Sequence, residues 1–449
     1  MNYKKFSLII SKPIQNFDKS IFVDSDKSTS IRSFLIGSIS HGISSVKNVL
    51  ESEDVFSTIN CLKKLGTKIS TLGNSHYKIY GKGLGSFRAK KKTKLDFGNS
   101  GTLSRLILGI ISSTPNMDLV VTGDKSLNKR SMKKIIILMS QFGAEFSPKN
   151  KFFFPLRVSS SNFPIGITYI SNTSAQLKSS VILAGLNSFG TTTVVEKYRS
   201  RDHTENMLKK NKNSIKITKG KTKLIEVFGK KYLDKFHLKV PGDPSSAAFF
   251  TALTLLKKNS SLKIKRVGLN PTRIGFYTLL KKSGAKIKFL NIKTINNEKI
   301  GDILVKSSSL KPIKASKKYY LSATDEYPML FIMSALIQGV SSFSGISDLK
   351  NKESDRILEI QKVLKQIGIY SKFYNDKLII KGKNFHSITN KTVHVANLGD
   401  HRICMSTAIL AYLTGIKVQI KNFETVRTSS PNFLKIIKTL GGKFETKKI

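Results

Sequence analysis

The stretch SGTLSRLILGIISS, residues 100–113, carries the pattern on which the fold prediction rests. It opens with small polar residues and continues for about three turns as a segment that is apolar nearly all round, so we expect a buried helix. Five further stretches repeat this pattern, with starts about 70–80 residues apart, at residues 28–41, 174–187, 245–256, 325–338 and 400–415. The repetition predicts six structural units.

A second, amphipathic helix lies between these copies and is closed by a glycine before a strand. Its copies are CLKKLGTKIS at 61–70, LMSQFGAEFS at 138–147, LLKKSGAKIKF at 279–289, VLKQIGIYSKF at 363–373 and IIKTLGGKFE at 436–445. The glycine is well placed as a left-handed helix cap. The copy near 204–217, TENMLKKNKNSIKI, has asparagine instead, which is the next best residue for that conformation. We therefore predict an α/β protein of six βα-type units, three in each domain.

Length and composition limit the class of protein. A chain of 449 residues is too long for one ordinary core, so we expect two domains of roughly 200 residues each. The apolar run at residues 6–10 is too short for a signal peptide, and no stretch approaches the ~18 apolar residues of a membrane span. Cys61 and Cys404 lie far apart without metal-ligand spacing, which favours a cytoplasmic location.

The formal net charge of +49 has two explanations. One is a polyanionic partner such as nucleic acid or a membrane surface. The other is lysine placed at every solvated position, around a site for small anions. Lysine is spread along the whole chain, and the chain has no Trp and no basic motif interleaved with aromatic residues. The sequence therefore favours the second explanation.

The arginines indicate where anions bind. Only about a dozen are present, and an Arg that survives in a Lys-rich chain is expected to use its rigid bidentate fork on carboxylates or phosphates. Seven fall inside the motifs described below: Arg32, Arg105, Arg130, Arg201, Arg273, Arg356 and Arg402.

The starts of the six buried helices have two interpretations. Free N–H groups and partial positive charge at a helix N-terminus suit an anion, and several converging ends would make a strong anion trap. Ser and Asp are also simply good N-caps. For any one helix capping is sufficient, whereas six regularly spaced starts, most with a basic residue in the first turn, favour the trap.

Several motifs in the first half suit anions. Lys27, Ser28 and Arg32 stand near one helix start, and Gly101 would let the backbone approach a phosphate closely. The glycine loop matches neither the Walker loop nor the dinucleotide fingerprint, so nucleotide binding is not expected. Arg130 follows on a basic loop, which an exposed turn would explain equally well.

A second group of motifs opens with Ser174 and Gln176 at a helix start and continues with Arg201 in a string of mixed charge. The string also fits a surface ion-pair network. His203 has no second His or Cys nearby, so we predict no metal site.

The second half carries acidic groups beside basic ones. Asp325 stands at a helix start, Glu353 stands between Lys352 and Arg356, and Arg402 follows later. Carboxylates in different environments suit general acid and base roles, although an i,i+3 ion pair explains Glu353 and Arg356 equally well. These residues by themselves indicate an enzyme that acts on small phosphates and carboxylates.

Taken together, the motifs resemble the family of EPSP synthases (3-phosphoshikimate 1-carboxyvinyltransferases). The matching strings, in the family's order and spacing, are DKSTSIR at 26–32, DFGNSGTLSRL at 96–106, GDKSLNKR at 123–130, SAQLKSSVILAGL at 174–186, SRDHTENML at 200–208, VPGDPSSAAFF at 240–250, LNPTRIGF at 269–276, TDEYPM at 324–329, KNKESDRI at 350–357, GDHRICMS at 399–406 and TSSPNF at 428–433. SAQLK and SRDHTE are similar to the second of two subclasses.

The resemblance implies a two-domain inside-out α/β barrel, in which each domain has three βαβαββ repeats around buried parallel helices. Residues 1–24 and 244–449 would form a discontinuous C-terminal-type domain, and residues 25–243 an N-terminal-type domain. The active site is expected in the cleft between them. The implied reaction joins the enolpyruvyl group of phosphoenolpyruvate to the 5-hydroxyl of shikimate 3-phosphate in the shikimate pathway to chorismate and aromatic amino acids.

The resemblance also assigns roles to residues. For shikimate 3-phosphate it implies Lys27, Ser28, Arg32, Ser174, Ala175, Gln176, Arg201, Asp325 and Lys352. For phosphoenolpyruvate it implies Lys27, Gly101, Arg130, Gln176, Arg356 and Arg402. Asp325, Glu353 and Lys27 are the implied catalytic residues. It implies a cytoplasmic monomer that needs no metal or other cofactor and has no obligatory nucleic-acid or membrane partner.

Some positions depart from the family pattern. Ser131 replaces a usual Pro, which is expected to loosen its loop, and Ser430 replaces a usual Phe, which is expected to weaken packing. Thr428 stands where one subclass has a substrate-binding Lys. Gly101 leaves room where bulkier residues often confer glyphosate tolerance, so we predict sensitivity.

The sequence leaves two alternative functions open. The sister family transfers the same group to UDP-N-acetylglucosamine and typically carries a reactive cysteine in the N-terminal half, but the comparable stretch, residues 112–124, has none. The other alternative is a basic nucleic-acid-binding protein on the same fold.

Overall fold

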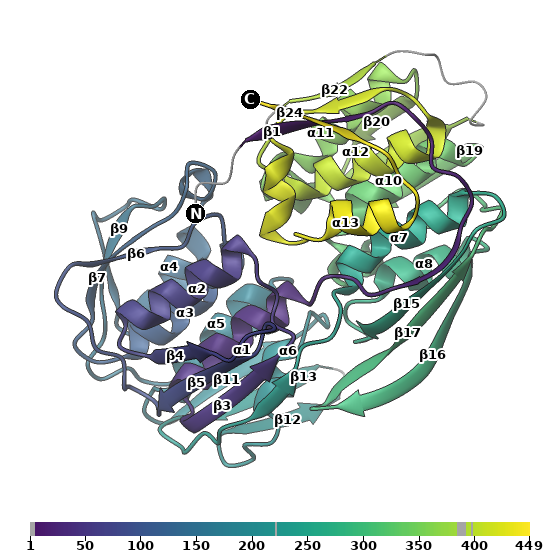
Figure 1. Ribbon diagram of the computed structural model, residues 1–449. Helices are drawn as coiled ribbons and strands as arrows, with labels where there is room; N and C mark the ends of the chain where they lie inside the picture. The colour runs from purple at the N-terminus through teal and green to yellow at the C-terminus, as the bar shows by residue number, and fades with distance from the viewer. Residues whose placement is uncertain (1–4, 221, 384–391, 397) are drawn as a thin grey trace. The chain divides into compact units, whose positions relative to one another are not determined.

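The computed structural model describes residues 5–220, 222–383, 392–396 and 398–449 (Figure 1). Residues 1–4, with which the predicted discontinuous domain begins, lie outside the described residues. The chain divides into two compact units. Unit 1 comprises Met1–Asp24, Pro241–Thr294 and Lys299–Ile449, and unit 2 comprises Ser25–Val240 and Ile295–Glu298.

Among the residues that the structure describes, each unit contains three four-stranded sheets. In unit 2 they are ordered β14(His237–Lys239)-β3(His41–Lys47)-β5(Tyr77–Lys82)-β4(Lys68–Thr71), β6(Thr93–Asp96)-β7(Asp118–Thr122)-β9(Leu156–Ser159)-β8(Glu145–Ser147) and β10(Thr168–Ser171)-β11(Thr191–Glu196)-β13(Lys223–Phe228)-β12(Ile215–Lys219). In unit 1 they are ordered β2(Asp18–Ile21)-β15(Ser261–Gly268)-β17(Glu298–Lys306)-β16(Lys286–Ile295), β18(Lys314–Ala315)-β19(Gly339–Ser344)-β21(Lys377–Gly382)-β20(Tyr370–Tyr374) and β22(Val393–Val395)-β23(Val418–Ile420)-β1(Phe6–Ile10)-β24(Glu445–Lys448).

All six sheets share one pairing pattern. In the orders given, the first pair of strands is parallel and the second pair is antiparallel. Three sheets take a strand from a distant part of the chain, and in one of them β2 pairs with β15. β1 pairs with β23 and β24, so that Leu8 lies opposite both Ile420 and Thr446, and β14 pairs with β3. The same architecture is thus built six times, which confirms the predicted α/β class and its repeats.

The six predicted buried helices are present. They are α1(Lys27–Ile39), α3(Gly101–Ser113) and α5(Ala175–Leu186) in unit 2, and α7(Pro244–Leu256), α10(Tyr327–Leu336) and α12(His401–Thr414) in unit 1. In α12 every residue from His401 to Leu413 is buried, because the helix packs against α7 and α10 rather than facing water on one side. Each unit encloses its own apolar core around its three helices.

Five of these helices begin with a side-chain N-cap, as the Ser and Asp residues predict. The capping residues Asp26, Ser100, Ser174, Asp243 and Asp400 each accept a backbone N–H from the first turn. α10 differs, because its N-cap residue Glu326 makes no side-chain cap bond.

The outer helices are α2(Glu53–Lys64), α4(Lys133–Gln141), α6(His203–Leu208), α8(Gly275–Lys282), α11(Arg356–Gln366) and α13(Phe433–Thr439). Five are followed by the predicted left-handed glycine, with φ between 70° and 96°, at Gly66, Gly143, Gly284, Gly368 and Gly441. α6 departs from the prediction. Its C-cap, Lys209, is right-handed, and the next asparagine, Asn211, instead accepts the backbone N–H of Asp234 with its side chain.

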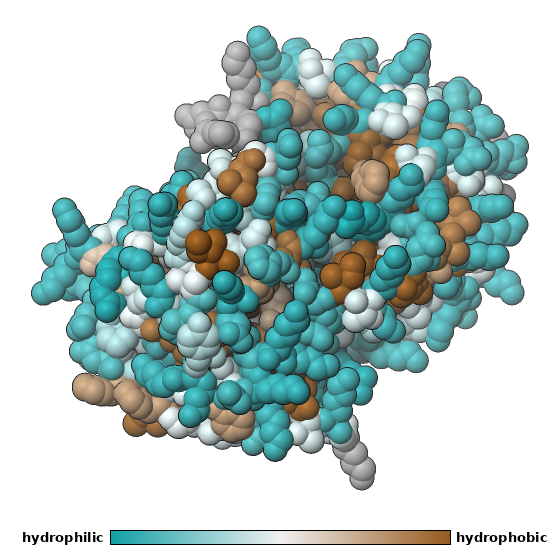
Figure 2. Space-filling model, turned by 60° about the horizontal axis from the view of Figure 1, so that its bottom comes forward, coloured by the Kyte–Doolittle hydropathy of each residue, from teal (hydrophilic) through white to brown (hydrophobic). Residues whose placement is uncertain are grey.

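Short helices complete the chain: η1(Leu127–Lys129), η2(Lys317–Tyr319), α9(Tyr320–Ala323), η3(Ser347–Asn351) and η5(Phe423–Thr428). In the described ranges no helix is long and apolar enough to cross a membrane. Hydrophilic residues cover most of the face seen in Figure 2, and hydrophobic residues form smaller groups between them.

Candidate active site

The start of α1 holds three of the predicted residues in unit 2. Lys27 Nζ lies 2.9 Å from Asp54 Oδ2 on α2. Arg32 is buried, and its Nε donates to Thr204 Oγ1 on α6 at 2.9 Å while Nη1 donates to the carbonyl of Ser28 at 3.2 Å. The arginine therefore has a fixed orientation between α1 and α6.

The start of α3 brings together two guanidinium groups. A Cβ on Gly101 would meet Arg105 Nη1 at 2.8 Å and Arg130 Nη1 at 3.2 Å. Arg105 Nη1 donates to the carbonyl of Gly101, and Arg130 Nη2 donates to Asn99 Oδ1 at 2.7 Å. A side chain at position 101 would therefore displace both guanidinium ends from beside this helix N-terminus, where an anion is favoured.

The start of α5 lies beside the start of α3. Ser174 is the N-cap and accepts the N–H of Leu177, and Ala175 is the first helical residue. Gln176 Nε2 donates to Thr102 Oγ1 in the first turn of α3 at 3.1 Å. Arg201 is half-buried in the loop before α6. The structure thus brings the predicted Gly101 and Gln176 close together through Thr102.

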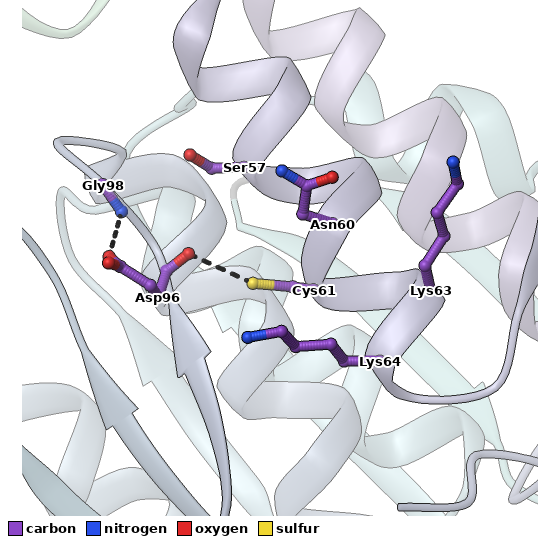
Figure 3. Close-up of a pocket in the computed structure, with 7 residues that line it drawn as sticks. All are labelled: Ser57, Asn60, Cys61, Lys63, Lys64, Asp96 and Gly98. Atoms are coloured by element: carbon purple, nitrogen blue, oxygen red, sulfur yellow. Dashed lines mark hydrogen bonds between the residues drawn. The ribbon is translucent and has the colours of Figure 1, made fainter. Parts of the chain in front are cut away.

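A groove of about 470 Å³ lies between α2 and the end of β6 in unit 2 (Figure 3). Lys63, Lys64 and Asp96 are among its lining residues, and it contains none of the predicted site residues. Burial raises the pKa of the Cys61 thiol there to about 12. The thiol therefore stays protonated and unreactive at neutral pH.

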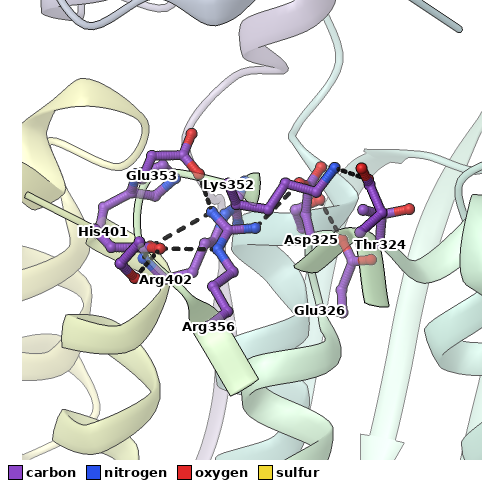
Figure 4. A network of polar contacts seen from close by, with 12 residues as sticks. Thr324, Asp325, Glu326, Lys352, Glu353, Arg356, His401 and Arg402 are labelled. Carbon is purple, nitrogen blue, oxygen red and sulfur yellow. Dashed lines mark hydrogen bonds and ion pairs between the residues drawn. The ribbon is translucent and has the colours of Figure 1, made fainter. Parts of the chain in front are cut away.

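Arg356 is the centre of the polar network in unit 1 (Figure 4). It is almost fully buried at the start of α11. Its Nε donates to Asp400 Oδ2 at 2.9 Å, and its Nη2 donates to Glu353 Oε2 at 2.5 Å. Although burial opposes the charge, Asp400 and Glu353 raise the pKa of Arg356, so it remains a cation.

Arg402 provides a second cation in unit 1. It is buried in the first turn of α12, and its guanidinium lies 5.9 Å from the ring centre of Phe249. Neither Nε nor Nη1 has a hydrogen-bond acceptor among the described residues. Arg356 Nη1 has no hydrogen-bond acceptor there either, since Asp325 Oδ1 is 3.8 Å away. Buried donors of this kind favour a bound anion.

The two predicted carboxylates occupy different positions around Arg356. Glu353 binds it directly, as an i,i+3 ion pair, whereas Asp325 lies at the greater distance of 3.8 Å. Lys352 pairs with Asp348 Oδ2 at 2.6 Å. Next to Asp325, the side chain of Glu326 is buried and accepts from Ser245 Oγ, which in turn accepts from Arg273 Nη2 at 2.9 Å.

Sequence reasoning missed the role of Asp400. This fully buried carboxylate accepts from Arg356, from Ser354 Oγ at 3.0 Å and from the backbone N–H of Arg402 at 2.9 Å. It therefore connects both arginines. The only signal in the sequence was its place two residues before Arg402, where it looks like an ordinary N-cap.

The departures from the family pattern also have defined positions. Ser131 Oγ accepts the N–H of Lys133 at 3.3 Å, and Thr428 is buried and donates to the carbonyl of Thr425. Ser430 Oγ donates to the buried carboxylate of Asp24 at 2.7 Å. Where the family usually packs a phenylalanine, Ser430 thus makes a hydrogen bond. This bond connects the C-terminal segment of unit 1 to Asp24, the last residue of the first segment of that unit.

No three His, Cys, Asp or Glu side chains in the described part of the chain form a set that could hold a metal ion. His203 Nδ1 lies 2.8 Å from Glu298 Oε1, and Asn206 Nδ2 donates to the same oxygen at 3.1 Å. The mixed-charge string 200–208 therefore includes contacts of α6 with the tip of the β16–β17 hairpin, which is distant in the chain.

Comparisons with known proteins give one consistent result. A family profile for EPSP synthase (3-phosphoshikimate 1-carboxyvinyltransferase) matches residues 11–437. The 3-phosphoshikimate 1-carboxyvinyltransferase of Zymomonas mobilis is 37% identical over 441 residues, which cover 97% of each chain. That of Petrotoga mobilis is 38% identical over 440 residues, 95% of this chain and 98% of the relative.

Solved structures agree with the sequence comparisons. A structure of EPSP synthase from Acinetobacter baumannii superposes with a TM-score of 0.85 at 34% identity, covering 99% of this chain and 100% of that one. The enolpyruvyl transferase NikO from Streptomyces tendae, at 12% identity and a TM-score of 0.75, shares the fold. From the whole-chain match of profile, relatives and fold, this chain belongs to the EPSP synthase (3-phosphoshikimate 1-carboxyvinyltransferase) family of shikimate-pathway transferases.

Proposed function

We propose that this chain transfers the enolpyruvyl group of phosphoenolpyruvate to the 5-hydroxyl of shikimate 3-phosphate, releasing inorganic phosphate. The observation that carries the proposal is the pair of buried guanidinium groups in unit 1. The guanidinium of Arg356 and the backbone N–H of Arg402 both donate to Asp400, and both guanidinium groups retain donors without an acceptor among the described residues. A planar carboxylate matches such donors in bidentate fashion.

Phosphoenolpyruvate carries a carboxylate and a phosphate, and two groups of residues suit them. Arg356 and Arg402 hold the carboxylate in this proposal. Arg130 holds the phosphate beside the N-terminus of α3, where Gly101 allows close approach. Lys27 and Gln176 complete the contacts.

Shikimate 3-phosphate is assigned to the starts of α1 and α5. Ser174, the backbone at Ala175, Gln176 and Arg201 hold its phosphate, and Ser28 and Arg32 hold its carboxylate end. Lys27 lies between the two substrates, and Asp325 with Lys352 contacts the 5-hydroxyl. The fixed orientation of Arg32 between Ser28 and Thr204 supports this assignment, because a pre-oriented arginine loses less entropy on binding.

The chemistry needs one acid and one base. Glu353 gives a proton to the methylene carbon of phosphoenolpyruvate, which makes C2 electrophilic. The oxygen of the 5-hydroxyl attacks C2 and its proton passes to Asp325. The tetrahedral adduct then returns a methyl proton to the carboxylate of Glu353 and expels phosphate, which takes up the proton held by Asp325; this restores the double bond as an enol ether. Lys27 and the arginines stabilise the negative charge that develops, without a metal or other cofactor.

For assembly and location the proposal is a cytoplasmic monomer with small-molecule substrates and no obligatory nucleic-acid or membrane partner. Strands of the same chain complete all six sheets, including the distant pairs β1–β24 and β14–β3, so a second copy is not needed to finish the fold. Both cysteines are buried and free, which suits a reducing compartment. The molar mass of the purified protein, measured by light scattering, tests the prediction that it is a monomer.

The experiment that tests the function measures phosphate release from phosphoenolpyruvate, with shikimate 3-phosphate or UDP-N-acetylglucosamine as acceptor in parallel. We expect release only with shikimate 3-phosphate. Glu353→Gln and Asp325→Asn should each lower turnover by at least about 100-fold, the usual loss when a general acid or base is removed.

Glu359→Gln is the matched control. Glu359 lies on the same helix as Arg356 and also forms an i,i+3 ion pair, with Lys362 at 2.7 Å, so its loss tests the effect of breaking such a pair alone. Its turnover should stay within about twofold of the parent, as expected for a surface pair. Phosphate release with UDP-N-acetylglucosamine alone would assign the chain the activity of the sister family. No phosphate release with either acceptor, from protein shown to be folded, would refute the proposal.

A further inference from the structure

A buried ionic cluster lies close in the chain to residues assigned to shikimate 3-phosphate, since its member Lys178 follows Gln176 by two residues in α5. Lys178 Nζ is 2.6 Å from Glu196 Oε1 and 2.7 Å from Glu205 Oε1. Lys223 Nζ is 2.9 Å from Glu205 Oε1 and 3.5 Å from Glu196 Oε2. The four side chains come from α5, β11, α6 and β13, and they balance two positive charges with two negative ones. The cluster therefore joins four elements of unit 2.

Stability alone is a weak reason for such a cluster. The side chain of Lys178 is fully buried, and those of Glu196 and Glu205 are 1% exposed. Burying charges is costly, and apolar residues of similar volume are often equally good or better. Although burial raises the pKa of Glu205, Lys178 and Lys223 lower it to about 2. Glu205 thus stays ionised at neutral pH.

Glu196 connects the cluster to the loop that carries Arg201. Its Oε1 accepts the backbone N–H of Ser200 at 2.9 Å and the hydroxyl of Ser200 at 2.6 Å. Ser200 is buried and directly precedes Arg201. Residues 197–202 form neither helix nor strand, so no backbone ladder orients this loop, and the two hydrogen bonds to one charged oxygen restrain it instead.

The cluster also borders the contacts of Arg32. Thr204, the neighbour of Glu205, accepts from Arg32 Nε and donates to Ser179 Oγ at 2.8 Å, and Ser179 follows Lys178. Arg32 and Arg201, at the two ends of the proposed acceptor site, are therefore each separated from a member of the cluster by one hydrogen bond and one step along the chain.

We infer that Glu196 and Ser200 are positioning residues, which hold the loop 197–202 so that Arg201 is oriented for the phosphate of shikimate 3-phosphate. The inference rests on the proposed function, in which Arg201 binds that phosphate. A pre-oriented arginine loses less conformational freedom on binding, so losing the restraint should weaken the acceptor specifically and leave phosphoenolpyruvate unaffected.

The test is Ser200→Ala, which removes the hydroxyl and leaves the four charges in place. We expect the Kd for shikimate 3-phosphate, measured by titration calorimetry, to rise about tenfold, as for one lost hydrogen bond to a charged group. The KM for phosphoenolpyruvate should stay within about twofold. Ser188→Ala is the matched control, because Ser188 is also buried, lies two residues after the end of α5 and donates one hydrogen bond, to the carbonyl of Ala184.

A double-mutant cycle decides whether Ser200 acts through Arg201. If it does, Ser200→Ala has no further effect on the Kd in an Arg201→Ala background. Additive losses, an equal rise of both KM values, or an unchanged Kd would overturn the inference. Glu196→Gln, which keeps an oxygen acceptor, serves as the second variant and should weaken acceptor binding less than Ser200→Ala. If the parent protein releases phosphate with shikimate 3-phosphate, the proposed function stands even when the Ser200 variants contradict this inference. The two failures can therefore be told apart.

Discussion

Arginine and lysine serve different purposes in this chain. Twelve of the 77 basic residues are arginines, yet among the described residues four buried cations are arginine (Arg32, Arg273, Arg356 and Arg402) and one is lysine (Lys178). A guanidinium is weakly hydrated and offers five donors in a rigid fork, so it tolerates burial beside carboxylates better than an ammonium does. Lys27 and Lys223 pair with buried carboxylates without being fully buried themselves. Three of the four buried arginines, Arg32, Arg356 and Arg402, belong to the candidate site.

At the residue scale, Gly101→Ala tests the space beside Arg130. The new Cβ would lie 3.2 Å from Arg130 Nη1 and 2.8 Å from Arg105 Nη1, so both guanidinium ends must move by a few tenths of an ångström. We expect the KM for phosphoenolpyruvate to rise about fivefold, equivalent to about 1 kcal/mol of overpacking. The parent enzyme should be inhibited by glyphosate and the variant less so. Steady-state kinetics with inhibitor titration measure both.

Gly268→Ala is the control for this change, since the nearest atom to its Cβ would be 3.5 Å away, at ordinary contact distance. Equal KM values for the parent and Gly101→Ala would mean that Arg130 does not bind phosphoenolpyruvate in the expected position.

Ser430→Ala tests the bond that replaces the family's usual phenylalanine. Burial raises the pKa of Asp24, and the hydroxyl of Ser430 is one of its few donors. Loss of this donor should lower the free energy of unfolding by about 1–2 kcal/mol, measured by urea denaturation. The neighbouring Ser429 is equally buried, and its hydroxyl has no hydrogen-bond partner among the described residues. Ser429→Ala should therefore change stability by less than about 0.5 kcal/mol, and equal losses in both variants would contradict the role of the bond.

At the scale of elements, the buried helices are held at their N-termini by charged groups. Asp400 at the start of α12 binds Arg356 at the start of α11, and Lys178 in α5 binds Glu205 in α6. In both cases the ion pair connects a buried helix to an outer helix of the same unit. Such pairs fix the relative positions of helix starts, which is where the proposed anion contacts lie.

The pairing of Glu205 predicts a pH dependence of stability. Its pKa is about 2 in the folded protein and 4.5 ordinarily, so folding favours the ionised form. The contribution, of order 3 kcal/mol, is complete above pH 4.5 and is lost as the pH falls from about 4.5 toward 2. Glu205→Gln should lower stability at pH 7, and its difference from the parent should shrink as the pH falls to about 3.

Urea unfolding at several pH values measures this difference. Glu226→Gln is the control, because Glu226 is partly exposed and 3.8 Å from Lys216, so its removal should cost less than about 1 kcal/mol at any pH. A difference between Glu205→Gln and the parent that is the same at pH 7 and pH 3 would show that Glu205 is not ionised more readily in the folded state.

At the scale of the whole molecule, the net charge of +49 opposes folding through self-repulsion. The chain has 28 acidic and 77 basic residues. Several of the acidic residues form ion pairs with buried arginines and lysines. The surface is therefore left with an even larger excess of lysine. Binding of nucleic acid to such a surface would be non-specific and strongly dependent on salt.

Salt should therefore stabilise this protein. Raising NaCl from about 0.01 M to about 0.15 M shortens the Debye length from ~30 Å to ~8 Å and screens the repulsion. We expect Tm to rise by at least about 3 °C, which calorimetry measures. Chloride is used because phosphate and sulfate would also occupy the anion sites. A constant or falling Tm would mean that the surface charges do not repel one another appreciably.

Many residues of the candidate site could be predicted from the sequence. Lys27, Gly101, Ser174, Glu353 and Arg402 were found in local motifs at helix starts. The partners that orient these residues were not, because they come from distant segments. Asp400 lies 44 residues from Arg356, and Glu196 looks like the end of an ordinary strand until Lys178 is placed beside it.

The sequence by itself determined the six repeated units, the buried helices with their caps, five glycine-closed outer helices and the family. These are local properties, set by hydrophobic periodicity and by the φ that glycine permits. Tertiary structure alone decided that β1 lies between β23 and β24, that α6 ends without a left-handed residue, and which carboxylate holds which arginine. Strand order and buried ion pairs depend on contacts between residues far apart in the chain, and such contacts leave no periodic signal.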